Sequence, residues 1–276
     1  MHSYGKTADN LKNEISKIKK LDFHDAMHFS FQDKINLKQN KDIAKFYNFY
    51  KNIFCKNNLS TIVPSATPII PHLLHQVWLG SEYPEKYRGI AGKWIKMHPG
   101  WKYKLWTDEN IKELFPLYNQ EHFDKCTNNG EKSDIIRYEI LYRFGGIYFD
   151  TDYECFKSFE ILTHCYDFIG GLEPFNISAL FTGNALIGCA PGHPIIDTCI
   201  KTLKAYRSYE KLTMRTGPAH LTRAIMKTGY SKNMMIFPVG YIYPFSRYGK
   251  KIERSRANEY IYEESLGIHY WWGSWK

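Results

Sequence analysis

The sequence predicts an α/β fold in which helices flank a central mixed sheet, preceded by a helical N-terminal extension. Three observations support this fold class. The chain has 276 residues, of which 43% are hydrophobic and 16% aromatic, so it can bury one large core. Short apolar runs that end in glycine or polar residues alternate with segments of helical periodicity. The first 66 residues also differ in composition from everything that follows.

Residues 1–66 form the predicted extension. They hold eleven lysines, no arginine and six acidic residues, and their apolar residues recur at helical spacing. We therefore expect two or three amphipathic helices. Such helices can contact an anionic membrane surface, or they can pack on the protein's own domain with the lysines in water. The proline-containing segment 61–71 leads into the predicted main domain, residues 67–276.

Net charge and cysteine usage restrict the classes of function. The net charge of +9 favours anionic partners such as nucleotides or phospholipid headgroups, although it also promotes solubility. The six cysteines contain no C-x-x-C pair, so neither a zinc ribbon nor a disulfide framework is expected. The N-terminus lacks an apolar signal-peptide core, and the chain lacks an uninterrupted apolar stretch of membrane-spanning length. We expect a cytoplasmic protein with reduced thiols, soluble or peripheral at the cytoplasmic face of the membrane.

The first central strand is predicted within Ile70 to Gly80, IPHLLHQVWLG. In a nucleotide-binding α/β sheet, ligands lie beyond the carboxyl ends of the strands. This rule places Val77 and Trp78 at the edge of a cleft, where an indole can stack on a nucleobase. The alternative is that Trp78 is an ordinary core residue.

The other elements of the main domain follow from the same patterns. Thr107 and Asp108 are predicted to cap the helix that follows them, and Thr216 is predicted to cap a helix that begins at a Gly-Pro pair. Helices are predicted over 88–97, 109–115 and 195–206, and strands over 101–107, 167–171 and 181–187.

The segment 133–152, SDIIRYEILYRFGGIYFDTD, is the most informative stretch. Its first twelve residues are helical in pattern, a Gly-Gly pair interrupts them, and residues 147–149 form a short buried strand. Asp150 lies where that strand ends. In extended chain, Asp150 and Asp152 would project to the same side, roughly 6 to 7 Å apart at the backbone.

Two carboxylates in this arrangement can hold a divalent cation that also binds substrate phosphates. An inert polar turn after the strand is the alternative, because turns favour aspartate. The residues of the preceding helix favour the metal site over the inert turn. Ser133, Asp134 and Arg137 lie on it, and Asp134 and Arg137 share a face that can fold beside the end of the strand.

The C-terminal segment from His269, HYWWGSWK, is the second informative stretch. Chain ends are usually polar and frayed, so three tryptophans and a histidine so close together indicate a docked tail. His269 and Ser274 offer groups that can bind a metal or a phosphate, and Trp275 offers an indole N–H donor. A hydrophobic plug is the alternative.

Ser-Asp-x-x-Arg followed by Gly-Gly-x-Tyr-x-Asp-x-Asp resembles the signature of glycosyltransferase family 32, whose members carry a DXD motif. That family includes yeast-type mannosyltransferases and bacterial capsule and lipopolysaccharide enzymes, and the catalytic domains of large clostridial toxins are related. The resemblance covers residues 69–276 and extends to the His-Gln-x-Trp-x-Gly strand, the Thr-Gly-Pro turn and the tail. It implies a GT-A type fold, a Mn²⁺ or Mg²⁺ ion, and transfer with retention of configuration and without a protein nucleophile.

The resemblance also implies roles for individual residues. Trp78 would stack on the base, Asn184 would face the donor or acceptor sugar, and Trp275 would donate to a phosphate oxygen. The ion would be held by Asp150 and Asp152, with its shell completed by His269 or Ser274. The implied catalytic residues are Asp134, Arg137, Asp150 and Asp152, and the implied nucleotide-sugar site also includes Val77, Trp78, Ser133, Tyr148, Asn184, Ser274 and Trp275.

The predicted function is metal-dependent transfer of a hexose from a nucleotide sugar, with UDP-sugars favoured over GDP-mannose. The acceptor would be a surface glycan or lipopolysaccharide, or a protein side chain as in toxin-like enzymes. A glycoside hydrolase would also use paired carboxylates but would need no cation. A basic membrane- or nucleic-acid-binding protein without catalysis is the remaining alternative. Nucleic acid is not expected as a partner, because no nucleic-acid-binding motif is present.

Overall fold

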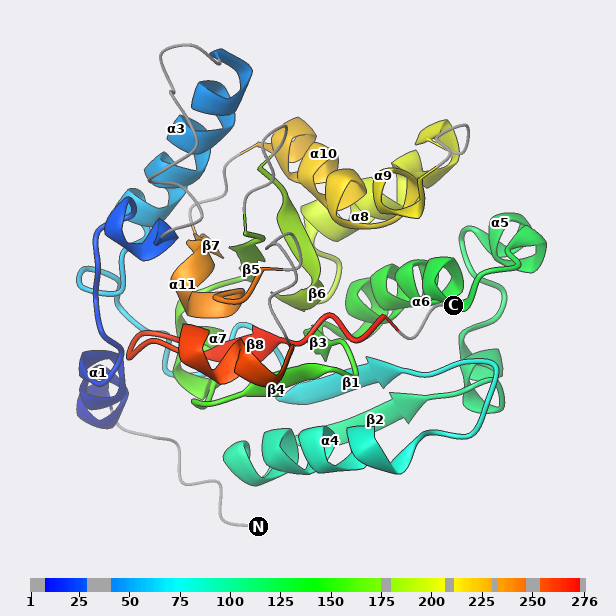
Figure 1. Cartoon of the computed structure of the whole chain (residues 1–276), viewed down its shortest axis with the longest axis horizontal. Coiled ribbons are helices and arrows are strands. Elements are labelled where there is room, and N and C mark those ends of the chain that lie inside the picture. The colour runs from blue at the N-terminus through cyan, green and yellow to red at the C-terminus, as the bar shows by residue number, and fades with distance from the viewer. Residues whose placement is uncertain are drawn as a thin grey trace.

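A six-stranded mixed sheet forms the centre of the protein in this computed structural model (Figure 1). The structure describes residues 8–28, 41–174, 180–206, 211–229, 233–246 and 254–273. The strand order is β2-β1-β3-β6-β5-β7, and β6 runs antiparallel to both of its neighbours. The predicted fold class is confirmed. The strands are β1 (Leu73–Val77), β2 (Lys102–Trp106), β3 (Gly146–Phe149), β5 (Phe168–Leu172), β6 (Thr182–Cys189) and β7 (Met234–Phe237).

Helices cover the central sheet. Figure 1 shows α8, α9 and α10 above the strands and α4 below them. Helix α6 contacts β1 and β3, and α10 contacts β6. The helices that follow β1 are α4 (Glu85–Met97), α5 (Gln120–Lys125), α6 (Asn129–Phe144), α7 (Glu160–Cys165), α8 (Pro194–Thr202), α9 (Leu212–Arg215), α10 (Pro218–Thr228) and α11 (Val239–Ile242). Short 3-10 helices span Asp25–Met27, Asn110–Leu114, Leu203–Tyr206 and Arg254–Tyr260.

A second, two-stranded sheet joins the C-terminal segment to the centre of the chain. Strand β4 (Tyr153–Cys155) pairs antiparallel with β8 (Gly267–His269), which places Tyr153 opposite His269. The chain after β8 runs across the molecule toward α6 in Figure 1. The tail is therefore docked beside the residues that follow β3, as the aromatic content of the tail predicts.

Helix α6 is buried along most of its length, and its buried residues include the polar Ser133, Asp134 and Arg137 as well as apolar side chains. Its N-terminus is capped by Asn128, whose side chain accepts hydrogen bonds from the N–H groups of Gly130 and Glu131. The helix ends at the Gly145–Gly146 pair, where both residues have positive φ. A Cβ at Gly145 would lie 2.7 Å from the Cys189 carbonyl oxygen, so only glycine fits this turn.

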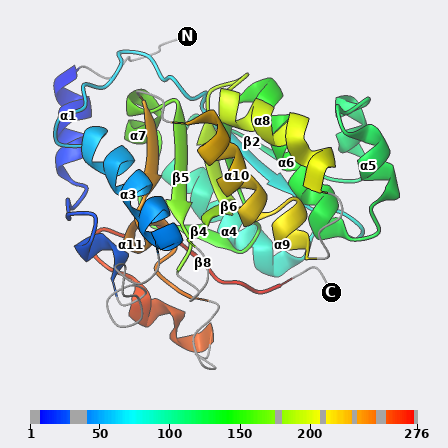
Figure 2. The same cartoon turned by 90° about the horizontal axis from the view of Figure 1, so that it is seen from above.

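The N-terminal helices pack on the same hydrophobic core as the central sheet. Figure 2 shows α3 (Lys41–Lys56) running along the β5–β7 side of the molecule, with α1 (Ala8–Ser16) beyond it. The Tyr50 hydroxyl of α3 contacts Thr182 Oγ1 at 2.9 Å, and Asn57 Nδ2 donates to the Met234 carbonyl oxygen. Several lysines of α3 are exposed. The domain boundary at residue 66 remains a prediction.

The predicted cap at Asp108 is wrong. The segment after it forms only the short 3-10 helix Asn110–Leu114, whose start receives no side-chain cap. Asp108 Oδ2 instead accepts a hydrogen bond from the Gly80 N–H at 2.6 Å, and so it connects the end of β2 to the loop after β1.

All six cysteines are free thiols. None of the described helices has both the length and the apolar character needed to cross a bilayer.

Candidate active site

The Asp150-Thr151-Asp152 motif lies in a tight turn between β3 and β4, where the Tyr153 N–H donates to the Asp150 carbonyl oxygen at 2.9 Å. The predicted extended conformation is therefore wrong. The backbone of Asp150 is held at the sheet edge because its N–H donates to the Ala185 carbonyl oxygen of β6. The turn still brings the two carboxylates together on one side.

Asp150, Asp152 and His269 form a compact group whose potential ligand atoms all lie within 4.8 Å of one another. His269 Nε2 lies 2.9 Å from Asp152 Oδ1 and 3.8 Å from Asp150 Oδ2. The imidazole comes from β8, which pairs with β4 immediately after the motif. Strand pairing thus explains how residues more than a hundred positions apart share one site.

Asp152 and His269 stabilise each other's charged forms. Burial would raise the pKa of Asp152, but the charge and hydrogen bond of His269 and the Trp272 N–H lower it on balance. Burial would lower the pKa of His269, but the Asp152 carboxylate raises it on balance.

The residues fit a hard divalent cation such as Mn²⁺. Two carboxylates and one imidazole are suitable ligands for it. His269 Nδ1 is buried and has no hydrogen-bond partner in the described part of the chain, so the ring is held through its Nε2 edge, which faces both carboxylates. The other predicted third ligand, Ser274, and the predicted phosphate donor, Trp275, lie outside the described residues.

The tail is pinned beside this group by its backbone and by Trp271. The N–H of Tyr270 donates to the Asp152 carbonyl oxygen, and the N–H of Trp272 donates to Asp152 Oδ2 at 2.7 Å. Trp271 has a φ of 56°, which is uncommon for a bulky residue. Its indole N–H donates to the Phe245 carbonyl oxygen.

Arg137 is the buried cation of the site and is 1% exposed. Its Nη2 donates to Asp150 Oδ1 at 2.8 Å and to the Tyr148 hydroxyl at 3.0 Å. Its Nη1 donates to the Asn184 carbonyl oxygen and lies 3.1 Å from Asp134 Oδ1. The structure therefore brings together the predicted residues from α6, β3 and β6.

Asp134 is also buried in this network. Burial raises its pKa to about 6, against the opposing effect of Arg137. Asn184 Nδ2 donates to its Oδ1 and Thr216 Oγ1 donates to its Oδ2, both at 2.8 Å. Asn184 thus lies in the predicted site, although the partner of its side chain here is Asp134.

The predicted capping role of Thr216 is wrong. The cap residue of α10 is Gly217, without a side-chain hydrogen bond. Thr216 instead contacts α6 twice, because its carbonyl oxygen also accepts the Tyr138 hydroxyl. The neighbouring Arg215 pairs with Glu131, one helical turn before Asp134. Thr216 is therefore a site residue that the Thr-Gly-Pro pattern could have indicated.

Ser133 and Glu173 complete the polar surroundings. The Ser133 hydroxyl is buried and has no hydrogen-bond partner among the described residues, which makes it available to a ligand. Glu173 follows β5 and is also buried, and its charge acts on His269 and Tyr243. Sequence reasoning missed Glu173, although its position directly after a parallel strand matches that of Asp150.

Val77 and Trp78 lie at the end of β1. Val77 belongs to the main core. Trp78 packs in a separate aromatic cluster with Tyr83 and Tyr87, against which Trp272 of the tail also packs. The Trp78 indole N–H donates to Ser81 Oγ and to the Glu82 carbonyl oxygen. The structure therefore places Trp78 next to the docked tail, and its contact with a base stays a prediction.

Comparison with known proteins agrees with this site. Residues 84–169 match the family described as "Glycosyltransferase sugar-binding region containing DXD motif". The chain is 32% identical over 170 residues to inositol phosphoceramide mannosyltransferase 3 of Schizosaccharomyces pombe, covering 58% of this chain and 46% of that protein. It is 29% identical over 201 residues to an uncharacterised glycosyltransferase of Acanthamoeba polyphaga mimivirus, covering 66% of this chain and 76% of that protein. The chain thus spans about half the length of the yeast relative.

The fold is also similar to that of a solved glycosyltransferase structure. The solved structure of PaToxG glycosyltransferase superposes with a TM-score of 0.52 at 20% sequence identity, covering 68% of this chain and 77% of that one. A similarity at this level of identity supports the GT-A type fold and carries no information on substrates. The DXD turn and the buried Arg137 both lie within residues 84–169, the segment that matches the DXD-containing sugar-binding region of glycosyltransferases.

Proposed function

We propose that the chain transfers a hexose from a nucleotide sugar to an acceptor and that it needs a divalent cation, Mn²⁺ or Mg²⁺, to do so. The observation that carries this proposal is the convergence of Asp150, Asp152 and His269 beside the buried guanidinium of Arg137. Carboxylates and a fixed cation placed together are suited to a substrate that carries a diphosphate.

The barrier to transfer from a nucleotide sugar lies in the departure of the diphosphate. A divalent ion held by Asp150, Asp152 and His269 would act there as a Lewis acid. Arg137 is fixed by four contacts, so it can stabilise the leaving group without reorganising. Asp134 lies one helical turn from Arg137 and can accept hydrogen bonds from sugar hydroxyls. The tail covers the site, with Trp272 anchored to Asp152.

Names of relatives guide the choice of sugar and acceptor. The yeast relative is named an inositol phosphoceramide mannosyltransferase. We therefore add mannose to the candidate sugars, beside the hexoses of UDP-sugars, and a glycolipid to the candidate acceptors, beside the surface glycans that the sequence suggests. We place the reaction at the cytoplasmic face of a membrane, because a protein of net charge +9 is attracted to anionic lipid surfaces. Retention of configuration is part of the same proposal.

Thermal shift measurements test this function. The folded protein is incubated with UDP-sugars and with GDP-mannose, each with and without Mn²⁺, since a ligand that binds only the folded state raises Tm. We expect one nucleotide class to raise Tm only in the presence of Mn²⁺, and Asp152→Asn to abolish that increase. Asp197→Asn removes a carboxylate paired with Lys201 on the surface and serves as the matched control. A shift that survives in Asp152→Asn would refute the assignment.

A further inference from the structure

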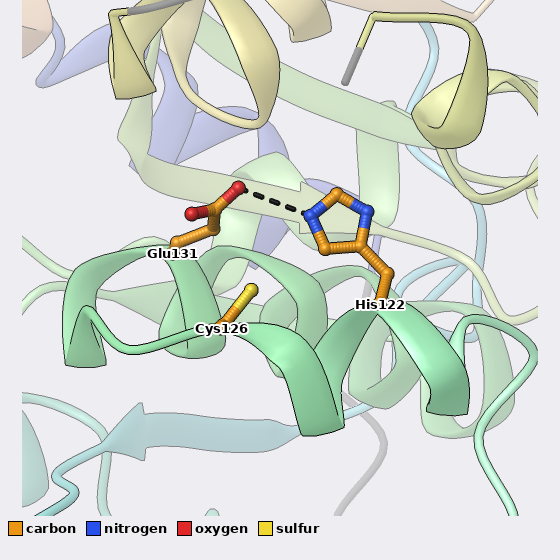
Figure 3. A group of neighbouring side chains, drawn as sticks. All are labelled: His122, Cys126 and Glu131. Carbon is orange, nitrogen blue, oxygen red and sulfur yellow. Dashed lines mark hydrogen bonds and ion pairs between the residues drawn. The ribbon is translucent and has the colours of Figure 1, made fainter. Parts of the chain in front are cut away.

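A second group of metal-binding side chains lies outside the DXD site. Figure 3 shows His122 on α5, Cys126 directly after that helix, and Glu131 in the first turn of α6. One ligand atom from each residue lies within 4.8 Å of the others, and all three residues are buried. They belong to one helix-loop-helix segment, so the group is positioned by local structure.

The donor atoms of this group face one another. His122 Nε2 lies 3.0 Å from Glu131 Oε1, and Figure 3 shows the sulfur of Cys126 pointing into the space between them. An imidazole nitrogen, a thiolate sulfur and a carboxylate oxygen are each ligands that Zn²⁺ takes in proteins. A thiolate also discriminates against Mg²⁺ and Mn²⁺, which prefer oxygen ligands. The chemistry of this group is therefore different from that of Asp150 and Asp152.

The carboxylate of Glu131 is held from the side by Arg215. Arg215 Nε donates to Glu131 Oε1 at 3.0 Å, and its Nη2 donates to Oε2 at 2.8 Å. Ligating carboxylates are commonly oriented by such outer hydrogen bonds. The Asn128 side chain caps α6 through the Glu131 N–H and so fixes the backbone from which this carboxylate projects.

The group opens on one side to a pocket of about 220 Å³, which leaves room for a water molecule as a fourth ligand. We propose that His122, Cys126 and Glu131 bind a Zn²⁺ ion that is separate from the ion of the DXD site. When both groups ligate the ion, the hydrogen bond between His122 and Glu131 is lost and the imidazole proton moves from Nε2 to Nδ1, and Cys126 loses its thiol proton to solvent. The pocket is lined by His122, Lys125, Cys126, Thr127, Glu131 and Arg215.

A zinc ion here would stabilise the contacts that connect α5 and the start of α6 to Asp134 of the active site. It would join α5 to the start of α6 and fix the Glu131 carboxylate that holds Arg215. Thr216, the next residue, donates to Asp134. The proposal does not depend on transferase activity, because it concerns metal binding alone. The competing explanation is a buried His122–Glu131–Arg215 network with Cys126 as an apolar neighbour.

The test uses the full chain, stripped with a chelator and titrated with Co²⁺ as a spectroscopic substitute for Zn²⁺. The titration is carried out on the Asp152→Asn variant, so that metal binding at the DXD site is weakened. We expect a thiolate-to-cobalt charge-transfer band in the near ultraviolet that one equivalent of Zn²⁺ abolishes. Cys126→Ser should remove the band and weaken Zn²⁺ binding by at least about 100-fold. Cys55→Ser changes an exposed thiol and should leave both the charge-transfer band and the affinity for Zn²⁺ unchanged.

A stability measurement accompanies the titration. Zn²⁺ at about 100 times its dissociation constant should raise the Tm of the parent protein by about 5 °C and leave that of Cys126→Ser unchanged. His122→Gln provides a second variant with the thiol intact, and it should weaken Zn²⁺ binding while keeping its metal-free Tm. The proposal is overturned if Co²⁺ gives no charge-transfer band, if the band persists in Cys126→Ser, or if Cys55→Ser removes it.

Discussion

Asp150 and Asp152 are two positions apart, yet they belong to two differently built halves of the site. The sheet half consists of residues from α6, β3 and β6 and the first residue after β3, namely Asp134, Arg137, Tyr148, Asn184 and Asp150. The tail half consists of Asp152, His269 and Trp272, whose contacts come from the β4–β8 sheet and the chain after it.

The difference concerns what holds each half. In the sheet half, Arg137 is surrounded by partners that the central sheet itself positions, so this half is fixed by the folding of the core. In the tail half, Asp152 is itself the anchor for His269 and for the Trp272 N–H. Changes in the sheet half should therefore lower stability and function together, and changes in the tail half should lower function with little loss of stability.

The largest expected effect is that of Arg137→Met. Removing a buried cation leaves Asp134 and Asp150 without their partner, which costs about 3 to 5 kcal/mol of unfolding free energy. Donor binding should also be lost. Urea denaturation measures the first effect and thermal shift with donor the second. Arg143→Met, on the exposed side of the same helix, should reduce the free energy of unfolding far less. If the two variants were equally stable, the claim that the core fixes the sheet half would be wrong.

Asp152→Asn tests the tail half. We expect transferase activity to fall by about 100-fold or more, because the charge that binds the ion is lost. The Tm without metal should change little, since an amide can still accept the Trp272 N–H and donate to His269. Activity and Tm are measured on the same preparation. A large loss of Tm would show that this half is also part of the structural core.

Lowering the pH should act in opposite directions on two buried histidines, His75 of β1 and His269 of the tail half. His75 donates from Nε2 to the Gly145 carbonyl oxygen before β3, and burial lowers its pKa to about 4. Its contribution to stability is complete above its unfolded pKa of about 6.5 and is lost as the pH falls toward 4, by about 2 kcal/mol between pH 7 and 5. The raised pKa of His269 has the reverse effect, because its contribution is complete below about 6.5 and is lost as the pH rises through the folded value.

Urea denaturation at pH 7 and 5 measures this difference. His75→Gln should reduce the loss of stability on acidification relative to the parent protein. His269→Gln should increase that loss. If both substitutions changed the dependence on pH in the same direction, the assignment of opposite charge states to the two histidines would be wrong.

Thr216→Val should have the smallest effect. It removes one hydrogen bond to the buried carboxylate of Asp134, and we expect kcat/KM for the donor to fall about tenfold. Thr216→Ser keeps the hydroxyl and should restore most of the activity. Steady-state kinetics with varied donor give the comparison. A valine variant with unchanged kcat/KM would show that Thr216 does not position Asp134.

Local patterns in the sequence predict much of the sheet half. Helix α6, the glycine pair and β3 follow from periodicity and composition, and they place Arg137 near Asp150. Long-range contacts are different. Thr216 and Asn184 lie 82 and 50 positions from Asp134, and no local pattern specifies which side chain meets which. The turn at Asp150 was only the alternative to the predicted extended conformation, because Asp-Thr-Asp is compatible with both.

The most direct test of the central claim is a crystal structure with Mn²⁺ and the nucleoside diphosphate of the preferred donor, with data collected for the anomalous signal of manganese. We predict one manganese peak within coordination distance of Asp150, Asp152 and His269, in contact with the diphosphate and beside Arg137. A diphosphate bound elsewhere, with both aspartates still paired only to Arg137 and His269, would contradict the account.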